Sequence, residues 1–501
     1  MKQKTTHHKK ALHLPKIYHN IMVSGTLLCA GMLLIPLLTL IRFCCIKPVS
    51  GAAADTDILS LLTDTGEKEV SVGYDEGGVF SLDGKLIAQN YYADSGWQKL
   101  CGIPGYNGVL GSEGCGGAIQ NWYDVLHSTA SPVNRQMRCG DTVQTTLIST
   151  AQEYAAMRLA EHFPEEICTD ACVCVVLRDG AVVVDAGSNA CEADDYFSDD
   201  KIKRIHEHYA VEPLQTGSVI KAPMARILQL YDGKLPQEWS VYSDTFEDIS
   251  YYDTPNGIRI HNHDYKNPNC YERNDQGLYI RESSLAQALM KSSNTYFLRH
   301  MLTLGGNAQH AYQIAGETFG LFEPIKTEIA ELAPVTCTED KLMYYFWGQS
   351  FNCAPIRLCE IYNHALSGDA YTPFFVSTVY LPDQTVIYQA DPQPRQNLHF
   401  DVQQQDILKD ALAQCFDAYR ISETVTKDYG ALIAQNRLLT KSGTAETAGD
   451  RTNAVRVLSV LDDNMELTAT ACIAVHNLET PISQDLLYQI LLETLHEAKI
   501  I

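Results

Sequence analysis

An apolar stretch of 21 residues near the N-terminus, Ile21 to Ile41, contains no charged side chain. A run of this length can cross a bilayer as an α-helix, and a proline within it is compatible with a membrane helix. Five lysines precede the stretch, whereas only Arg42 and Lys47 follow it closely. Because positive charge gathers on the cytoplasmic side, the pattern predicts a cytoplasmic tail over 1–16, a single-pass anchor in the cell membrane over 17–46 and an extracytoplasmic remainder.

A cleaved signal peptide is the alternative interpretation of the same stretch. Ala52-Ala53-Ala54 offers the small residues that a cleavage site requires. The apolar part of a signal peptide is usually shorter than this run, and the length therefore favours a retained anchor.

Beyond the anchor, the spacing of apolar residues predicts three regions. Residues 47–68 form a linker. Residues 69–165 mix short strand-like runs with glycine-rich loops and end in a helix over 147–162, which indicates a small non-catalytic module of the pedestal or dimerisation type. Residues 166–501 form one larger domain of strands and helices.

Two hairpins are predicted within the larger domain. Apolar runs at 172–177 and 181–186 are joined by Arg178-Asp179-Gly180, a typical hairpin signature. The second hairpin covers 455–475, with its turn at Asp462-Asp463-Asn464. Helical spacing of apolar residues predicts the helices: one directly after Ser218, two within 283–304, most of 305–365, and 483–498. The other segments are predicted as a strand over 438–441 and loops over 187–214 and 232–280.

The charge balance excludes one class of partner. The chain has 38 basic and 61 acidic residues. Residues 1–54 hold seven of the basic residues and none of the acidic ones, which leaves 31 against 61, a net charge near −30, for the rest. Nucleic-acid binding needs basic surface, so no nucleic-acid partner is expected, and the negative charge is interpreted as favouring solubility.

The cysteines and histidines do not define a metal site. Among the 16 cysteines, Cys101 and Cys115 flank a glycine-rich loop and could form a disulfide, whereas Cys174 and Cys472 lie in strand-like runs and are predicted to be core residues. No set of Cys and His residues in the sequence has the spacing of a zinc site. His261-Asn262-His263 lacks the flanking residues of a metal or nuclease motif, which favours a structural or surface role.

Ser218 and Lys221 are the first candidate catalytic pair. They lie three residues apart at the start of a predicted helix, and residues i and i+3 share one helix face. A serine hydroxyl becomes a good nucleophile when a neighbouring base takes its proton. A lysine can be that base when it is neutral, and burial beside a second cation favours the neutral amine.

Two further motifs follow in order: Ser292-Ser293-Asn294 and Lys441-Ser442-Gly443-Thr444. Together with Ser218-Val-Ile-Lys221 they resemble the S-x-x-K, S-x-N and K-[ST]-G set of penicillin-binding proteins and serine β-lactamases. The wider sequence, over about 70–475, resembles the class B penicillin-binding proteins, which are membrane-anchored peptidoglycan transpeptidases. Flanking matches are Gly77 to Ala88, Gly140 to Leu147, Leu214 to Lys221, Ala286 to Phe297, and Gly348-Gln349 with Pro355.

The resemblance implies an α+β fold, with a five-stranded, mainly antiparallel sheet flanked by helices and an all-helical part beside it. It also implies a role for each motif residue. Ser218 would be acylated at a D-Ala-D-Ala carbonyl, Lys221 would accept its proton, and Ser292 would relay that proton. Lys441 would keep Lys221 neutral by like-charge repulsion.

The substrate-binding residues implied by the resemblance are Asn294, Ser442, Gly443 and Thr444. Asn294 would bind the substrate backbone, and Ser442 and Thr444, with Lys441, would bind the terminal carboxylate. The backbone N–H groups of Ser218 and Thr444 would form the oxyanion hole. Neither a cofactor nor a metal is expected.

The function predicted in this way is a D,D-transpeptidase that cross-links peptidoglycan stem peptides and is acylated by β-lactams. A D,D-carboxypeptidase differs only in the acceptor. A β-lactamase would need a base for a hydrolytic water, and no E-x-x-x-N follows the second motif. A non-catalytic scaffold or sensor is the third alternative. By analogy with the family, a polytopic glycan polymerase could be a partner.

Overall fold

The computed structural model describes most of the chain after residue 74. The described residues are 75–92, 98–113, 117–188, 208–231, 246–249, 251–253, 259–262, 272–273, 279–418, 423–447, 449–480 and 482–501. They all belong to one unit of the chain, 56–501. The predicted tail, anchor and linker lie outside them. Within these residues, no helix has both the length and the apolar character needed to span a bilayer.

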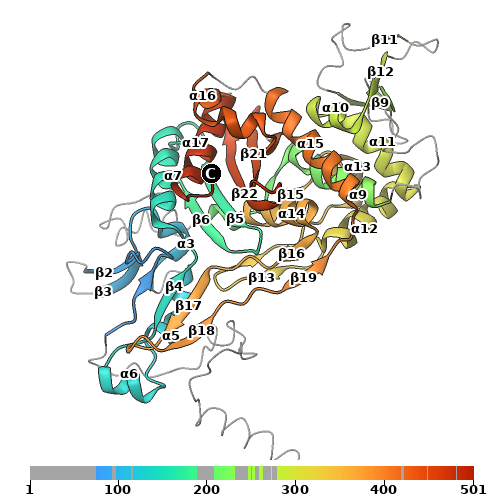
Figure 1. Ribbon diagram of the computed structural model, residues 1–501. Helices are drawn as coiled ribbons and strands as arrows, with labels where there is room; N and C mark the ends of the chain where they lie inside the picture. The colour runs from blue at the N-terminus through green and yellow to red at the C-terminus, as the bar shows by residue number, and fades with distance from the viewer. Residues whose placement is uncertain are drawn as a thin grey trace, which may run out of the picture. The chain divides into compact units, whose positions relative to one another are not determined.

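A five-stranded sheet forms the centre of the domain (Figure 1), in the order β20-β21-β22-β5-β6 with every neighbouring pair antiparallel. Both predicted hairpins are confirmed, as β5–β6 and β21–β22. Most residues of these strands are buried, because the sheet is covered on both faces, and their sequences are correspondingly apolar. The strands are β5 (Asp170–Leu177), β6 (Val182–Gly187), β20 (Leu438–Glu446), β21 (Thr452–Leu461) and β22 (Leu467–Leu478).

Helices cover the two faces of this sheet. On β5, Val173 and Val175 pack in one hydrophobic cluster with α17, whereas Cys172 and Cys174 pack in a second cluster with α14. This alternation follows from the two-residue period of a strand. The covering helices are α7 (Ser149–His162) and α17 (Gln484–Glu497) on one face and α14 (Pro355–Ser367) on the other. The predicted α+β fold with a five-stranded sheet is confirmed.

The all-helical part lies beside the sheet. Its short helices begin at side-chain caps: Ser284 accepts the Gln287 N–H, Ser293 the Tyr296 N–H and Asn307 the His310 N–H. The prediction of two helices within 283–304 is confirmed. The helices are α9 (Lys221–Leu230), α10 (Leu285–Met290), α11 (Asn294–Gly305), α12 (Ala308–Phe319), α13 (Leu342–Tyr345), α15 (Val402–Ala418) and α16 (Glu423–Ala434).

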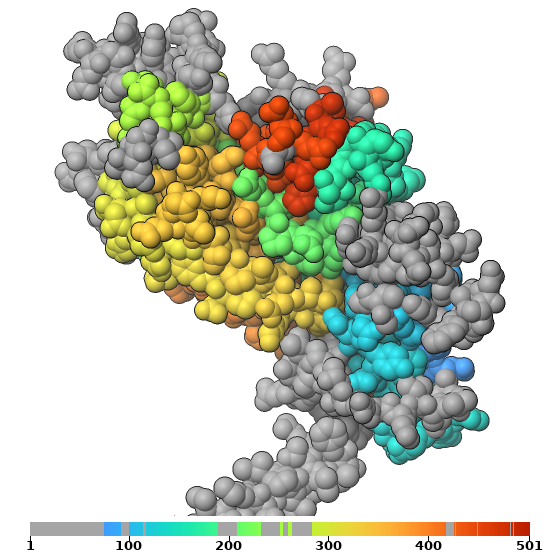
Figure 2. Space-filling model, turned by 180° about the vertical axis from the view of Figure 1, so that it is seen from behind, coloured from blue at the N-terminus to red at the C-terminus, as the bar shows by residue number. Residues whose placement is uncertain are grey.

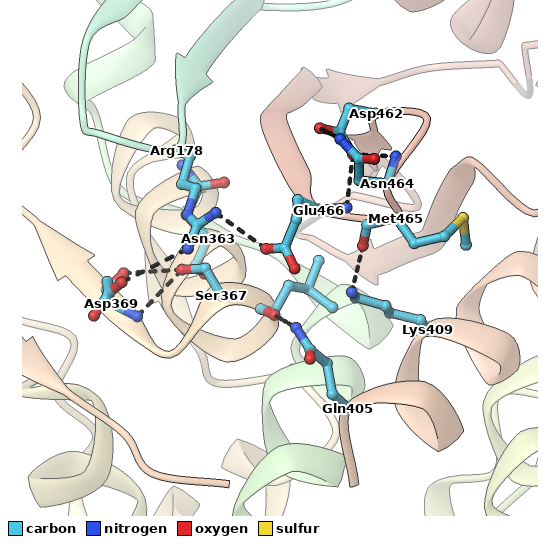
Figure 3. Close-up of polar contacts among 11 residues, drawn as sticks. Arg178, Asn363, Ser367, Asp369, Gln405, Lys409, Asp462, Asn464, Met465 and Glu466 are labelled. Carbon is cyan, nitrogen blue, oxygen red and sulfur yellow. Dashed lines mark hydrogen bonds and ion pairs between the residues drawn. The ribbon is translucent and has the colours of Figure 1, made fainter. Parts of the chain in front are cut away.

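Polar contacts tie the turn between β21 and β22 to α15 and to the turn between β5 and β6 (Figure 3). Lys409 Nζ on α15 donates to the carbonyl of Met465 at 2.6 Å, and Arg178 Nη1 lies 3.1 Å from Glu466 Oε2. Asp462 Oδ1 accepts the Glu466 N–H at 2.8 Å and closes the turn. Helix α15 also packs on α10, which precedes the second motif, and on β20, which carries the third motif. The Lys409 contact therefore helps to hold α15 against both motifs.

The predicted module over 69–165 shares structure with the predicted larger domain. Val79–Phe80 (β1) and Thr142–Thr145 (β4) form one sheet with Val376–Tyr380 (β17) and Val386–Gln389 (β18). Seen from behind (Figure 2), cyan residues of the module lie beside yellow residues of the larger domain. Across this contact Asn121 Nδ2 donates to the carbonyl of Ile329 at 2.9 Å. The domain boundaries stay predictions. The module also contains β2 (Ala88–Tyr92), β3 (Gln98–Gly102), α3 (Asn107–Leu110), α4 (Ala118–Asn121), α5 (Tyr123–Leu126) and α6 (Pro132–Met137).

The prediction that 232–280 consists of loops was wrong for its described residues. These residues form short strands whose polar side chains are stabilised by pairing across the hairpin, such as Arg259 Nε with Asp253 Oδ1 at 2.6 Å, rather than by an apolar face. The strands are β8 (Phe246–Ile249), β9 (Tyr251–Asp253), β10 (Arg259–His261), β11 (Glu272–Arg273) and β12 (Tyr279–Ser283). Other two- to four-residue strands are β7 (Leu214–Gln215), β13 (Ile325–Lys326), β14 (Glu331–Leu332), β15 (Asn352–Cys353), β16 (Asp369–Tyr371) and β19 (Pro394–Asn397).

The cysteine predictions divide in two. Cys174 and Cys472 are fully buried and face each other in the register of β5 and β22, which confirms that they are core residues. Cys115 lies outside the described residues, and its pairing with Cys101 stays a prediction.

Candidate active site

Ser218 lies in a tight 3₁₀ turn, Gly217–Ile220, that leads directly into α9. The turn places the Ser218 hydroxyl 2.9 Å from the amine of Lys221, as the three-residue spacing predicts. Ser218 is 7% exposed and Lys221 is fully buried. Ser218 therefore keeps a small exposed surface, while its partner amine is enclosed by protein.

The Lys221 amine makes two shorter contacts besides the one to Ser218. It donates to the carbonyl oxygen of Ser292 and to Asn294 Oδ1, each at 2.6 Å. Both atoms can only accept hydrogen bonds. A neutral amine has two N–H donors and one lone pair, so an amine that donates to both acceptors keeps its lone pair for one of the two serine hydroxyls, Ser218 at 2.9 Å or Ser292 at 3.2 Å. The contacts thus fix the buried amine beside Ser218.

Ser292 connects the two lysines of the site. It lies between α10 and α11 in the left-handed conformation, with φ of 51°. Its hydroxyl is 3.2 Å from Lys221 Nζ and 3.1 Å from Lys441 Nζ. The Ser292 oxygen can therefore pass a proton between a base near Ser218 and a group at the other side of the site.

The third motif lies inside strand β20. The strand was predicted to end at Lys441, but it continues through Ser442 and Gly443 to Glu446, because pairing with β21 extends to the end of both strands. Lys441 is fully buried and also donates to the Ser442 carbonyl at 3.1 Å. Ser442 is half-buried and Thr444 is exposed.

Three glycines bring separate backbone segments into contact behind Ser218. A Cβ atom on Gly443 would lie 2.2 Å from the Thr216 carbonyl oxygen, and one on Gly217 would lie 2.6 Å from the Thr444 carbonyl oxygen. A Cβ atom on Gly348 would lie 1.7 Å from the Gly217 carbonyl oxygen, and Gly217 N–H donates to Gly348 at 3.1 Å. Only glycine permits these approaches.

Residues 212–460 match the family model of the penicillin binding protein transpeptidase domain. This part of the chain belongs to this family. The resemblance to penicillin-binding proteins that the three motifs predicted is confirmed. The comparison with curated proteins found no match.

Solved penicillin-binding proteins share the fold. The D,D-transpeptidase domain of a peptidoglycan glycosyltransferase from Eggerthella lenta is 15% identical, with a TM-score of 0.64 over 85% of this chain and 100% of that chain. Penicillin-binding protein A from Mycobacterium tuberculosis, as a ceftriaxone acyl-enzyme complex, is 15% identical, with a TM-score of 0.65 over 88% and 100%. Penicillin-binding protein 2B from Streptococcus pneumoniae is 16% identical, with a TM-score of 0.54 over 72% and 60%.

In this penicillin-binding protein, a chain of hydrogen bonds runs from Ser218 through Lys221 and Ser292 to Lys441. The structure thus brings all four predicted catalytic residues together, and their catalytic roles stay predictions. Of the predicted substrate-binding residues, Ser442, Gly443 and Thr444 lie on the outer strand of the sheet, next to the Ser218 turn. Asn294 contacts Lys221.

The sequence prediction missed how His261 and Asn262 contribute to this site. The motif that contains them was assigned a structural or surface role, and His263 lies outside the described residues. The carbonyl of His261 accepts from Asn294 Nδ2 at 2.9 Å, and Asn262 Oδ1 accepts the Asn294 N–H at 2.7 Å. No group of His, Cys, Asp and Glu side chains in the described part of the chain is suited to hold a metal ion.

Proposed function

We propose that this protein is an acyl-serine D,D-transpeptidase. It cross-links peptidoglycan stem peptides at D-Ala-D-Ala, and β-lactams acylate the same serine. The observation that carries the proposal is the 2.9 Å contact between Ser218 Oγ and a buried lysine amine whose shorter contacts are both with acceptor oxygens.

The acylation step follows from that contact. Lys221 takes the proton of Ser218 as Oγ attacks the carbonyl carbon of the penultimate D-alanine. The negative charge on the carbonyl oxygen is stabilised by the backbone N–H groups of Ser218 and Thr444. When the C–N bond breaks, the proton passes from Lys221 through the Ser292 hydroxyl to the departing D-alanine nitrogen. The amine of a second stem peptide then attacks the ester carbon, the bond to Ser218 Oγ breaks, and the proton lost by the amine returns to Oγ.

Substrate binding uses the outer edge of β20. A stem peptide can add as a further strand there, because an edge strand presents N–H and C=O groups to a ligand. Lys441, Ser442 and Thr444 bind its terminal carboxylate. Asn294 Nδ2 has two N–H donors, so its bond to His261 leaves a second donor for the substrate backbone.

Labelling with a fluorescent penicillin tests the proposal. Wild-type protein should form a covalent adduct that survives denaturing electrophoresis, and Ser218→Ala should form none while keeping the wild-type melting temperature within about 2 °C. A folded wild type that takes no label would overturn the acyl-serine assignment. A thioester substrate supplied with a D-amino acid then separates the reactions, because a transpeptidase yields the aminolysis product and a carboxypeptidase yields mainly the acid.

The location of the site is a second part of the proposal. We propose that residues 17–46 anchor the protein in the cell membrane. The domain then faces the outside of the cell, where stem peptides occur. A polytopic glycan polymerase is the proposed partner beside it. A fusion of alkaline phosphatase to the C-terminus should be active and a fusion of a cytoplasmic fluorescent protein dark. The opposite result would place the domain in the cytoplasm and contradict this orientation.

A further inference from the structure

Asn262 is a buried polar residue that caps a helix from a distant segment. It follows β10 directly and is 1% exposed. Its Oδ1 accepts the backbone N–H groups of Asn294 at 2.7 Å and Thr295 at 3.1 Å, and the Ser293 hydroxyl at 3.2 Å. Its Nδ2 donates to Thr295 Oγ1 at 2.9 Å. The first N–H groups of a helix lack partners within the helix, and Asn262 supplies an acceptor for those of α11.

The neighbouring residue fixes the orientation of the Asn294 side chain. Asn294 Nδ2 donates to the carbonyl of His261 at 2.9 Å, and its Oδ1 meets Lys221 Nζ at 2.6 Å. An amide group donates at one end and accepts at the other. Because His261 holds the donor end, the acceptor end must face Lys221. Residues 261 and 262 thus set both the backbone and the side chain of the second motif.

A hairpin presents these two residues to α11. Strand β10 pairs with β9 in register, with His261 opposite Tyr251. Arg259 forms an ion pair with Asp253 and places its guanidinium 4.2 Å above the Tyr251 ring. The exposed ion pair contributes little by itself, but the paired strands give the His261 carbonyl and Asn262 a defined direction.

We propose that Asn262 is a positioning residue for acylation of Ser218. It holds the start of α11 so that Asn294 and Ser292 stay in reach of Lys221. This inference rests on the proposed function. A shift of a reacting group by about 1 Å can slow a reaction about a hundredfold. Asn262→Ala removes the four hydrogen bonds described above and should therefore slow acylation about tenfold to a hundredfold.

The test measures the limiting acylation rate and the half-saturating concentration of a fluorescent penicillin separately, with the full chain. Asn262→Ala should lower the limiting rate, whereas a purely structural role would lower only the fraction of protein that takes label. Asn262→Asp keeps the acceptor oxygen and should recover to within about threefold of wild type. Asn262→Ser, whose shorter side chain cannot reach α11, should also have a lowered limiting acylation rate. It replaces Asn262→Ala in the test if the alanine variant does not fold.

Asn307→Ala is the matched control. Asn307 caps α12 through the His310 N–H at 2.9 Å, at the other end of α11 from the second motif. Its removal should lower stability by about 1 kcal/mol and leave the limiting rate unchanged. If wild type is labelled and Asn262→Ala keeps its limiting rate within about twofold, or Asn307→Ala is slowed equally, this inference is overturned. If wild type takes no label, the proposed function itself fails.

Discussion

Gly217 joins the nucleophile turn to the strand that carries the third motif. Its φ is 61°, in the left-handed region that favours glycine, and a Cβ atom there would meet the carbonyl oxygen of Thr444 at 2.6 Å. Such a contact is too short for any real Cβ atom, so a side chain at 217 would displace β20 from the Ser218 turn. The proposed oxyanion donors, one on each segment, would then separate.

Gly217→Ala should therefore lower the acylation rate about a hundredfold or more, the loss typical of one oxyanion donor. Gly306→Ala is the matched control, because Gly306 also has a positive φ, 70°, but no atom lies within 4 Å of its added Cβ. Both variants should lose about 1 kcal/mol of stability from the left-handed strain, and Gly217→Ala should lose more because its Cβ also clashes with the Thr444 backbone. Only Gly217→Ala should lose acylation of a fluorescent penicillin. Equal rates in the two variants would contradict the role of this backbone contact.

At the residue scale, the sequence was sufficient to predict which side chains meet. Ser218 and Lys221 are close because of local spacing, and the order of the three motifs identified Ser292 and Lys441. The backbone of Ser292, with φ of 51°, could not be predicted, since the connection between α10 and α11 imposes it. The contribution of Asn262 could not be predicted either, because it depends on contacts between segments about 32 residues apart.

At the element scale, one buried arginine fixes α9, the helix that carries Lys221. Arg226 is fully buried. Its Nε donates to the Ala365 carbonyl at 2.7 Å, its Nη1 donates to the Gln404 carbonyl at 3.1 Å, and its guanidinium lies 3.8 Å from the Phe400 ring centroid. The side chain therefore joins α9 to α14 and α15 through a planar group with several donors.

Arg226→Lys keeps the charge but loses this fork of donors. We expect it to lower the free energy of unfolding by about 3 kcal/mol, the scale of hydrogen bonds to a charged group. Chemical denaturation measures this change. The acylation rate of the folded protein should stay close to that of wild type, because these hydrogen bonds of Arg226 go to Ala365, Gln229 and Gln404, which lie outside the three motifs. Unchanged stability would show that Arg226 does not anchor α9.

Elements built on strong apolar patterns were predicted well, and elements built on polar pairing were not. The hairpins β5–β6 and β21–β22 consist of long apolar runs between clear turns. By contrast, β9 and β10 carry polar side chains that pair across a hairpin, and their composition favours loops. The sheet that joins β4 with β17 links residues more than 200 positions apart, and neither strand has a local pattern that identifies its partner.

At the scale of the whole molecule, buried titratable groups make stability depend on pH with opposing signs. Burial lowers the pKa of His300 and of His364 to about 3. Burial raises the pKa of Glu328 to about 7. In mild acid, the unfolded chain takes up protons on the two histidines, which favours unfolding, whereas the folded chain takes up a proton on Glu328, which favours folding. Because two histidines oppose one glutamate, the net effect of these three groups in mild acid is a loss of stability. A single variant is needed to separate the contributions.

His364→Leu isolates one of these contributions. His364 is fully buried in α14, its ring lies edge-on to Phe319 at 5.3 Å, and neither ring nitrogen has a hydrogen-bond partner among the described residues. An apolar side chain of similar size should therefore pack there without leaving a polar group unpaired, and we expect the variant to be about 1 kcal/mol more stable at pH 8.

The sign of the pH effect follows from the depressed pKa of His364. Its folded pKa of about 3 lies below the unfolded value of 6.5. The stability that depends on a neutral His364 is therefore fully present above pH 6.5 and is lost as the pH falls toward 3. At pH 5 this loss is about 2 kcal/mol relative to pH 8. His364→Leu should therefore lose about 2 kcal/mol less than wild type between pH 8 and pH 5 in urea unfolding. Parallel losses in the two proteins would mean that His364 takes up a proton without unfolding, and hence that water reaches the core between α12 and α14.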